Sequence, residues 1–186
     1  MGRSTTSSSS SSSISLIFLL PYIFLLSVDF YGANLRANAV TPLIQRACDF
    51  SMVREFCYNV MENDPEAQLA TTKIDLENVT IRLAYSNFTN IARKAWTITA
   101  NETNPEYKQI YRKCLHQYIR LRLDFQNFTQ TLESNGDLDQ VAQGAITHIF
   151  ACTSFFQSPS IPNPFAQDNE NLGWFIELIR DIYLTI

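Results

Sequence analysis

The stretch of residues 104–132 constrains the fold most, because its apolar side chains recur at alternating spacings of four and three. That spacing places them in one stripe along an α-helix, straight enough to be the seam of a helical bundle. Asn104 is a good N-cap, Pro105 suits the first helical turn, and Asn135-Gly136 can end the helix. Cys114 lies in the middle of the stripe, which indicates a covalent bond to a neighbouring helix. The stripe consists of Tyr107, Tyr111, Cys114, Tyr118, Leu121, Phe125, Phe128 and Leu132.

The first 39 residues have the pattern of a secretory signal peptide. A Ser/Thr run ends at Ser13, an apolar run covers residues 14–26, and Ala37-Asn38-Ala39 has the small residues of a cleavage site. A membrane anchor is the alternative, but the apolar run is shorter than the roughly 20 residues that a span needs, and Pro21 interrupts it. We therefore expect a signal peptide over residues 1–39, one mature domain over residues 40–186, and no membrane segment after cleavage.

The cysteines favour two disulfides over a metal site, because the chain is short, is expected to be secreted and has four of them. Cys48 and Cys57 are close enough in sequence to close a local loop. Cys114 and Cys152 lie on the stripes of two helices joined by a short turn. Of the three possible pairings, we favour Cys48–Cys57 with Cys114–Cys152.

Export also agrees with four Asn-x-Thr sequons in the mature region. We expect glycosylation at these positions, with reduced use of either the first or the second site, since both flank the apolar face of their helix. The acceptor residues are Asn78, Asn87, Asn101 and Asn127.

Three further helices and a hairpin complete the predicted fold. The hairpin begins at Thr41, with Ser51 as the cap of its second segment. A long helix follows over residues 69–99, after the cap at Asp64. Its apolar residues lie on two sides, so we expect the hairpin to cover the second side. Helices beginning at Asp137 and covering residues 169–183 repeat the stripe pattern. The sequence therefore predicts an all-α, up-down four-helix bundle with an N-terminal helical hairpin and two disulfides.

No catalytic constellation is evident. His116 and His148 are not accompanied by a nucleophile in a recognisable turn, and the acidic residues near Asp64 suit a helix start. We interpret Trp96 and Trp174 as packing residues. The net charge of −4 provides no basic surface for nucleic acid. We expect no metal and no cofactor, and a domain without catalytic groups indicates recognition of a partner.

The order and spacing of several motifs resemble the plant invertase/pectin methylesterase inhibitor family. Eight residues separate Cys48 from Cys57, and Asn63-Asp64-Pro65 is similar to the Ser-Asp-Pro segment of the family. Cys114 with Tyr118 is similar to its Cys-x-x-x-Tyr motif, Gly136-Asp137 to its Gly-Asp turn, and Cys152 before Phe155 and Phe156 to its late cysteine.

The resemblance implies disulfides paired in sequence order and a monomeric inhibitor of the apoplast or cell wall, with the vacuole as the alternative. Its partner would be pectin methylesterase or acid invertase, bound one to one over the active-site region. Invertase inhibitors carry Pro-Lys-Phe after Gly-Asp, where this chain has Leu138-Asp139-Gln140, which favours pectin methylesterase. The candidate partner-contact turn is Asp137, Leu138, Asp139 and Gln140. A helical interaction protein without inhibitory activity and an enzyme are the remaining alternatives.

Overall fold

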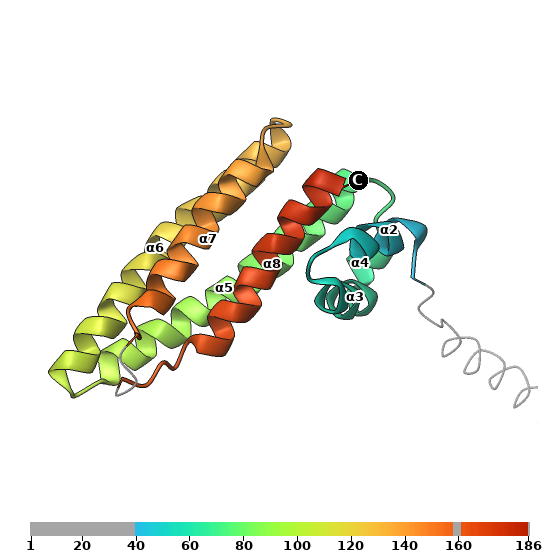
Figure 1. Cartoon of the computed structure of the whole chain (residues 1–186). Coiled ribbons are helices and arrows are strands. Elements are labelled where there is room, and N and C mark those ends of the chain that lie inside the picture. The colour runs from blue at the N-terminus through green and yellow to red at the C-terminus, as the bar shows by residue number, and fades with distance from the viewer. Residues whose placement is uncertain (1–39, 158–160, 186) are drawn as a thin grey trace, which may run out of the picture. The chain divides into compact units, whose positions relative to one another are not determined.

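The structure, a computed structural model, describes residues 40–157 and 161–185, and in these ranges it contains helices and no strand. The expected signal peptide lies outside the described residues. Among the described residues, three short helices precede four long ones, and Figure 1 shows their arrangement. The helices are α2 (Pro42–Phe50), α3 (Arg54–Asn63), α4 (Pro65–Leu69), α5 (Lys73–Asn101), α6 (Pro105–Glu133), α7 (Leu138–Ser154) and α8 (Ala166–Thr185).

Helix α6 has the caps and the buried face that its sequence predicts. Asn104 Oδ1 accepts hydrogen bonds from the N–H groups of Glu106 and Tyr107, at 2.9 and 3.3 Å. Every stripe residue from Tyr111 to Leu132 is buried, and Tyr107 is half-buried. Asn135 takes the left-handed conformation, with φ of 52°, that terminates the helix.

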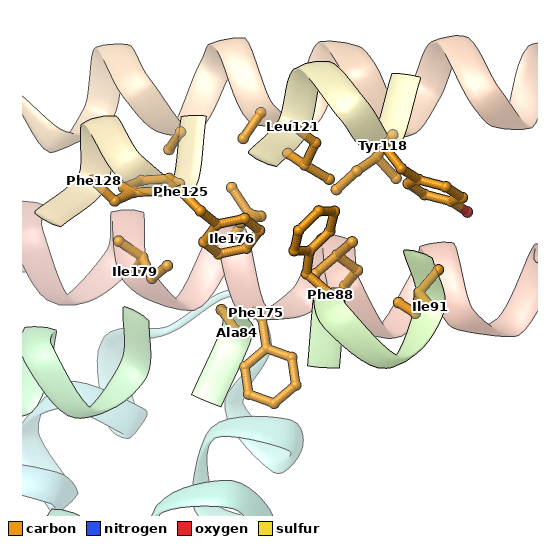
Figure 2. Close-up of a cluster of buried hydrophobic side chains, with 14 of the residues drawn as sticks. Ala84, Phe88, Ile91, Tyr118, Leu121, Phe125, Phe128, Phe175, Ile176 and Ile179 are labelled. Carbon is orange, nitrogen blue, oxygen red and sulfur yellow. The ribbon is translucent and has the colours of Figure 1, made fainter. Parts of the chain in front are cut away.

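The four long helices form a bundle in which α5 packs on α6, α6 on α7, α7 on α8, and α8 on α5. Their stripes meet in one apolar core, part of which is seen in Figure 2. Phe88 of α5 stacks on Phe125 of α6 with 5.1 Å between ring centroids. The all-α four-helix bundle is therefore confirmed.

The two disulfides expected of this fold are present. Cys114 of α6 is bonded to Cys152 of α7, with 4.5 Å between their Cα atoms. Beside this bond, the Tyr118 hydroxyl donates to Asn169 Oδ1 of α8 at 2.6 Å, and Asn169 Nδ2 lies 3.2 Å from the Cys152 sulfur. The core thus contains one compact polar group that joins α6, α7 and α8.

The start of α5 differs from the expected helix over residues 69–99. Leu69 ends the short helix α4 and is 74% exposed. A new start follows at Thr72, whose hydroxyl accepts from the Asp75 N–H while the Asp75 carboxylate accepts from the Thr72 N–H. This reciprocal capping box stabilises a helix end better than continuation from Leu69 would.

The N-terminal hairpin covers the second apolar side of α5, as predicted. Cys48 of α2 and Cys57 of α3 are bonded, with 5.4 Å between their Cα atoms, and they belong to the same buried apolar cluster as Leu76 and Val79 of α5. Ser51 does not cap α3 as expected, because the helix begins after Val53. Its hydroxyl accepts from the Val53 N–H at 3.1 Å and donates to Asp181 of α8 at 2.7 Å.

The segment before α8 is shorter than predicted, since α8 begins at Ala166 rather than near residue 169. Residues 158–160 of the expected linker lie outside the described residues. Phe165 is fully buried and makes edge contacts with the rings of Tyr111 and Tyr118. This aromatic contact anchors the chain where it enters α8.

Candidate interaction surface

The turn between α6 and α7 contains the predicted partner-contact residues. Asp137 caps α7, and its Oδ1 accepts from the N–H groups of Asp139 and Gln140 at 3.0 and 3.3 Å. Leu138 is only 1% exposed and belongs to the core, so the expectation that it faces a partner is corrected. A residue at the first position of α7 must close the end of the bundle, which is why an apolar side chain there turns inward. The side chains of Asp137 and Gln140 are exposed.

The same turn is fastened to α8 by an ion pair. Arg180 Nε donates to Asp139 Oδ1, and Arg180 also lies 3.4 Å from Glu177. Gln143 donates to the second Asp139 oxygen at 2.9 Å. The hydrogen bond to Asp139, with the charges of both carboxylates, raises the pKa of Arg180 further above its usual range. The turn therefore offers a fixed rather than an adaptable surface.

A cavity of about 230 Å³ opens next to this turn, and a buried carboxylate lines it. Glu77 of α5 is 2% exposed, and its Oε1 has no hydrogen-bond partner among the described residues. Burial raises the pKa of Glu77, and the Lys73 ammonium, 3.9 Å from Oε1, opposes this shift. Lys73 itself donates to the backbone carbonyl of Tyr183 and lies over its ring at 5.0 Å. The sequence contains a signal for this site, since Glu77 falls on the stripe between Ile74 and Ile81.

A groove runs along the outside of the bundle between α7 and α8, with a volume of about 340 Å³. We call it the α7–α8 groove and define it by Ile146, Phe150, Glu170, Gly173, Trp174 and Glu177. A Cβ atom added to Gly173 would meet no atom within 4 Å, so the groove is hollow at this point. Phe150 is 69% exposed although it is aromatic. The sequence did not predict this groove, because the spacing of apolar residues does not indicate where a glycine leaves space between two helices.

The two tryptophans differ from each other in exposure. Trp174 is half-buried and contacts Phe56 of α3, with 5.4 Å between ring centroids, as expected of a packing residue. Trp96 is 64% exposed on α5, which corrects the expectation that it packs. Tyr85 of α5 and Ile119 of α6 are also exposed, at 42% and 58%. The outer surface of α5 and α6 thus carries more apolar area than the predicted stripes require.

Several charged residues on the outer faces of the bundle are engaged within the chain. Arg82 pairs with Asp64 and Glu66 at 2.9 and 3.0 Å, and Lys94 pairs with Asp168 at 2.6 Å. Asp124 is half-buried, whereas two arginines remain exposed on α5 and α6, Arg93 and Arg120.

The histidines do not assemble a catalytic group. His116 is exposed. His148 Nδ1 lies 2.9 Å from Gln117 Oε1, and its Nε2 lies 3.6 Å from Asp124 Oδ2. This arrangement bridges α6 and α7. Within the described ranges no three His, Cys, Asp or Glu side chains are placed to hold a metal ion, and no helix there is long and apolar enough to cross a membrane.

The four sequon asparagines differ in accessibility. Asn78, Asn101 and Asn127 are exposed. Asn87 is half-buried, and its Oδ1 is buried without a hydrogen-bond partner among the described residues. Glycosylation stays a prediction at all four, and the geometry makes Asn87 the least suitable acceptor.

Comparisons with known proteins agree with this architecture. The sequence model of the plant invertase/pectin methylesterase inhibitor family matches residues 42–179, which include the hairpin and most of the bundle. The crystal structure of a mutant form of a pectin methylesterase inhibitor from Arabidopsis has a TM-score of 0.66 and 15% sequence identity. That match covers 77% of this chain and 96% of the Arabidopsis chain, and at this identity it shows the fold alone. No curated protein is significantly similar in sequence.

Proposed function

The chain belongs to the plant invertase/pectin methylesterase inhibitor family, and from this premise we propose that it is a secreted inhibitor of pectin methylesterase. The family consists of protein inhibitors rather than enzymes. The inhibitor acts in the apoplast or cell wall as a monomer, covering the active-site region of one enzyme molecule. Asp137, Asp139 and Gln140 form part of its contact surface.

The α6–α7 turn is the observation that favours pectin methylesterase over acid invertase. The sequence resemblance places the Pro-Lys-Phe motif of invertase inhibitors at Leu138-Asp139-Gln140. Here the first side chain is buried and the second is held by Arg180. This surface therefore presents acidic and amide groups and lacks the exposed lysine and phenylalanine of that motif.

Titration of the two enzyme classes with the same purified, oxidised protein tests the proposal. We expect stoichiometric loss of pectin methylesterase activity at acidic pH and unchanged acid invertase activity. Reduced and alkylated protein provides the control, because it retains the composition and net charge without the disulfide-bonded fold. Full pectin methylesterase activity at micromolar inhibitor would refute the proposal, and inhibition of invertase alone would assign the other target.

A bundle without inhibitory activity is the alternative that the exposed sequons favour. Glycans on Asn78, Asn101 and Asn127 would cover parts of α5 and α6. The same titration after enzymatic deglycosylation distinguishes a covered surface from an absent one. Inhibition that appears only after glycan removal would show that sugar controls access of the enzyme.

A further inference from the structure

We propose that the α7–α8 groove binds an apolar side chain of the target enzyme that has a basic residue beside it. This inference rests on the proposed inhibitor function and adds to it the location and the chemistry of one contact. The α6–α7 turn supplies a polar contact surface, whereas the groove supplies an apolar one with negative charge along it.

The shape of the groove fits one protruding side chain. Gly173 leaves the surface of α8 open where every other residue type would project a Cβ atom. Phe150 of α7 and Trp174 of α8 both line the groove. A branched aliphatic or aromatic side chain of a partner would exchange water for contact with these two rings. Such buried apolar anchors dominate the energetics of protein interfaces.

The charge along the groove defines the residue that stands beside the apolar anchor in the partner. Glu170 and Glu177 both line it, and they are seven residues apart on α8, about 10.5 Å along the helix axis. Gly173 lies between them. Glu170 accepts a hydrogen bond from the neutral side chain of Gln167 at 3.1 Å. Arg180 lies 3.4 Å from Glu177 and partly neutralises it. No lysine or arginine lines the groove beside Glu170, so this carboxylate attracts a partner with a cationic group next to its apolar anchor.

The wall formed by Trp174 is held in place before any partner binds. The Trp174 ring contacts Phe56 of α3, and Phe56 in turn meets Phe175 edge-on with 4.8 Å between centroids. Trp174 also lines a second hollow together with Met52 of the hairpin, and the Met52 side chain is 82% exposed. The apolar surface therefore continues from the bundle onto the hairpin. A single exposed aromatic residue is common on protein surfaces, whereas a hollow at a glycine, two rings and two acids in one groove is typical of a binding site.

Two substitutions test the groove with the whole, oxidised protein. Gly173→Leu fills the hollow, and because leucine favours helices more than glycine does, the variant is expected to unfold at the same temperature as the parent or higher. Glu170→Lys reverses one flanking charge on an exposed residue. Glu106→Lys is the control, since it makes the same charge change at an exposed position in the first turn of α6, outside the groove.

Binding to purified pectin methylesterase is measured by surface plasmon resonance, alongside the activity titration. We expect Gly173→Leu to raise Kd at least about tenfold, as loss of an interface anchor does. Glu170→Lys should lower the association rate and weaken its dependence on salt, with Glu106→Lys within about twofold of the parent.

Each other outcome overturns the inference in a distinguishable way. If the parent binds the enzyme and both groove variants bind equally well, the groove is not the contact and the proposed function stands. If the parent binds neither pectin methylesterase nor acid invertase, both proposals fail together. If the parent sediments as a dimer that Gly173→Leu dissociates, the groove belongs to a second copy of this chain, and the enzyme contact is refuted.

Discussion

Replacing Glu77 with glutamine should stabilise the folded protein at neutral pH. Glu77 occupies a core position of α5, is 2% exposed, and has an oxygen without a hydrogen bond among the described residues. Its one nearby cation, Lys73, is 3.9 Å away and donates instead to the Tyr183 carbonyl. Glutamine has nearly the same shape and carries no charge. The substitution therefore tests the charge at this position separately from the packing.

The expected gain is small and can be calculated from opposing terms. A buried acceptor without a partner costs about 1–3 kcal/mol, and a charged one costs more. Because the amide oxygen of glutamine also lacks a partner, the substitution removes only the additional cost of the charge. Removing the carboxylate also removes its attraction to Lys73, a half-buried pair of the kind that contributes at most about 1 kcal/mol. The difference leaves a net stabilisation of about 1 kcal/mol at pH 7.5. For a domain of this size, that corresponds to a rise of about 3–4 °C in Tm.

The gain should depend on pH with a definite sign. Burial raises the pKa of Glu77 in the folded state above its unfolded value. A carboxyl with a raised folded pKa favours folding below its unfolded pKa, and this contribution is lost as the pH rises through the folded pKa. At pH 4 both the parent and Glu77→Gln are neutral at this position, so their stabilities should agree. Their difference should grow as the pH rises above about 4.5 and level off once the parent is ionised.

Urea unfolding of the oxidised proteins at pH 4.0, 5.5 and 7.5 measures this difference. Glu133→Gln is the matched control, because Glu133 is an exposed carboxylate near the end of α6 and its substitution should change stability equally little at each pH. A Glu77→Gln variant less stable than the parent at pH 7.5 would refute the reasoning. A gain of equal size at all three pH values would show that packing rather than ionisation is responsible.

Three further predictions follow from individual contacts. Asn87→Gln should leave the number of glycans on the secreted protein unchanged by mass spectrometry, since this asparagine is half-buried, while substitution of any other sequon asparagine should remove one glycan. Replacing Cys114 and Cys152 with alanine opens a loop with a sequence separation of 38 and should lower the free energy of unfolding by about 4 kcal/mol. Tyr118→Phe leaves the buried amide oxygen of Asn169 without its donor and should cost about 1–3 kcal/mol in urea unfolding, and an unchanged midpoint would contradict that role.

The core of the bundle could be predicted because burial is periodic. The spacing of apolar residues predicts the buried stripe from Tyr111 to Leu132. The helix caps Asn104 and Asp137 are predicted by their residue type and by their position just before an apolar stripe begins. The Cys114–Cys152 disulfide followed from where those stripes place its two cysteines, and the Cys48–Cys57 disulfide from the short separation of its cysteines in sequence. Each of these features depends on one helix and its immediate neighbour.

The errors occurred where two local signals compete or where a side chain has an unusual environment. Near Leu69 the capping box at Thr72 and Asp75 overrides an uninterrupted apolar pattern. Trp96 is apolar and lies off the stripe of α5. Whether such a residue is exposed depends on whether another element covers it, and the sequence of α5 alone does not indicate this. The buried carboxylate of Glu77 lies on the apolar stripe of α5, so it could have been predicted as the charged position of that stripe. The groove at Gly173 could not have been predicted from the sequence, because it is a space between two helices.

Helix α8 explains how a bundle without a catalytic site can still offer a defined surface. Near its start, Asn169 is bonded to Tyr118 of α6 beside the disulfide, and near its end Asp181 accepts from the Ser51 hydroxyl and the Met52 N–H of the hairpin. Buried polar pairs contribute modestly to stability, but they penalise any sliding of a helix that would leave one member unpaired. The groove residues Gly173 and Trp174 lie between these two anchors. The side chains at the groove are therefore largely ordered before a partner binds. Binding there would lose less conformational entropy than binding to a flexible surface, and the affinity would be higher for that reason.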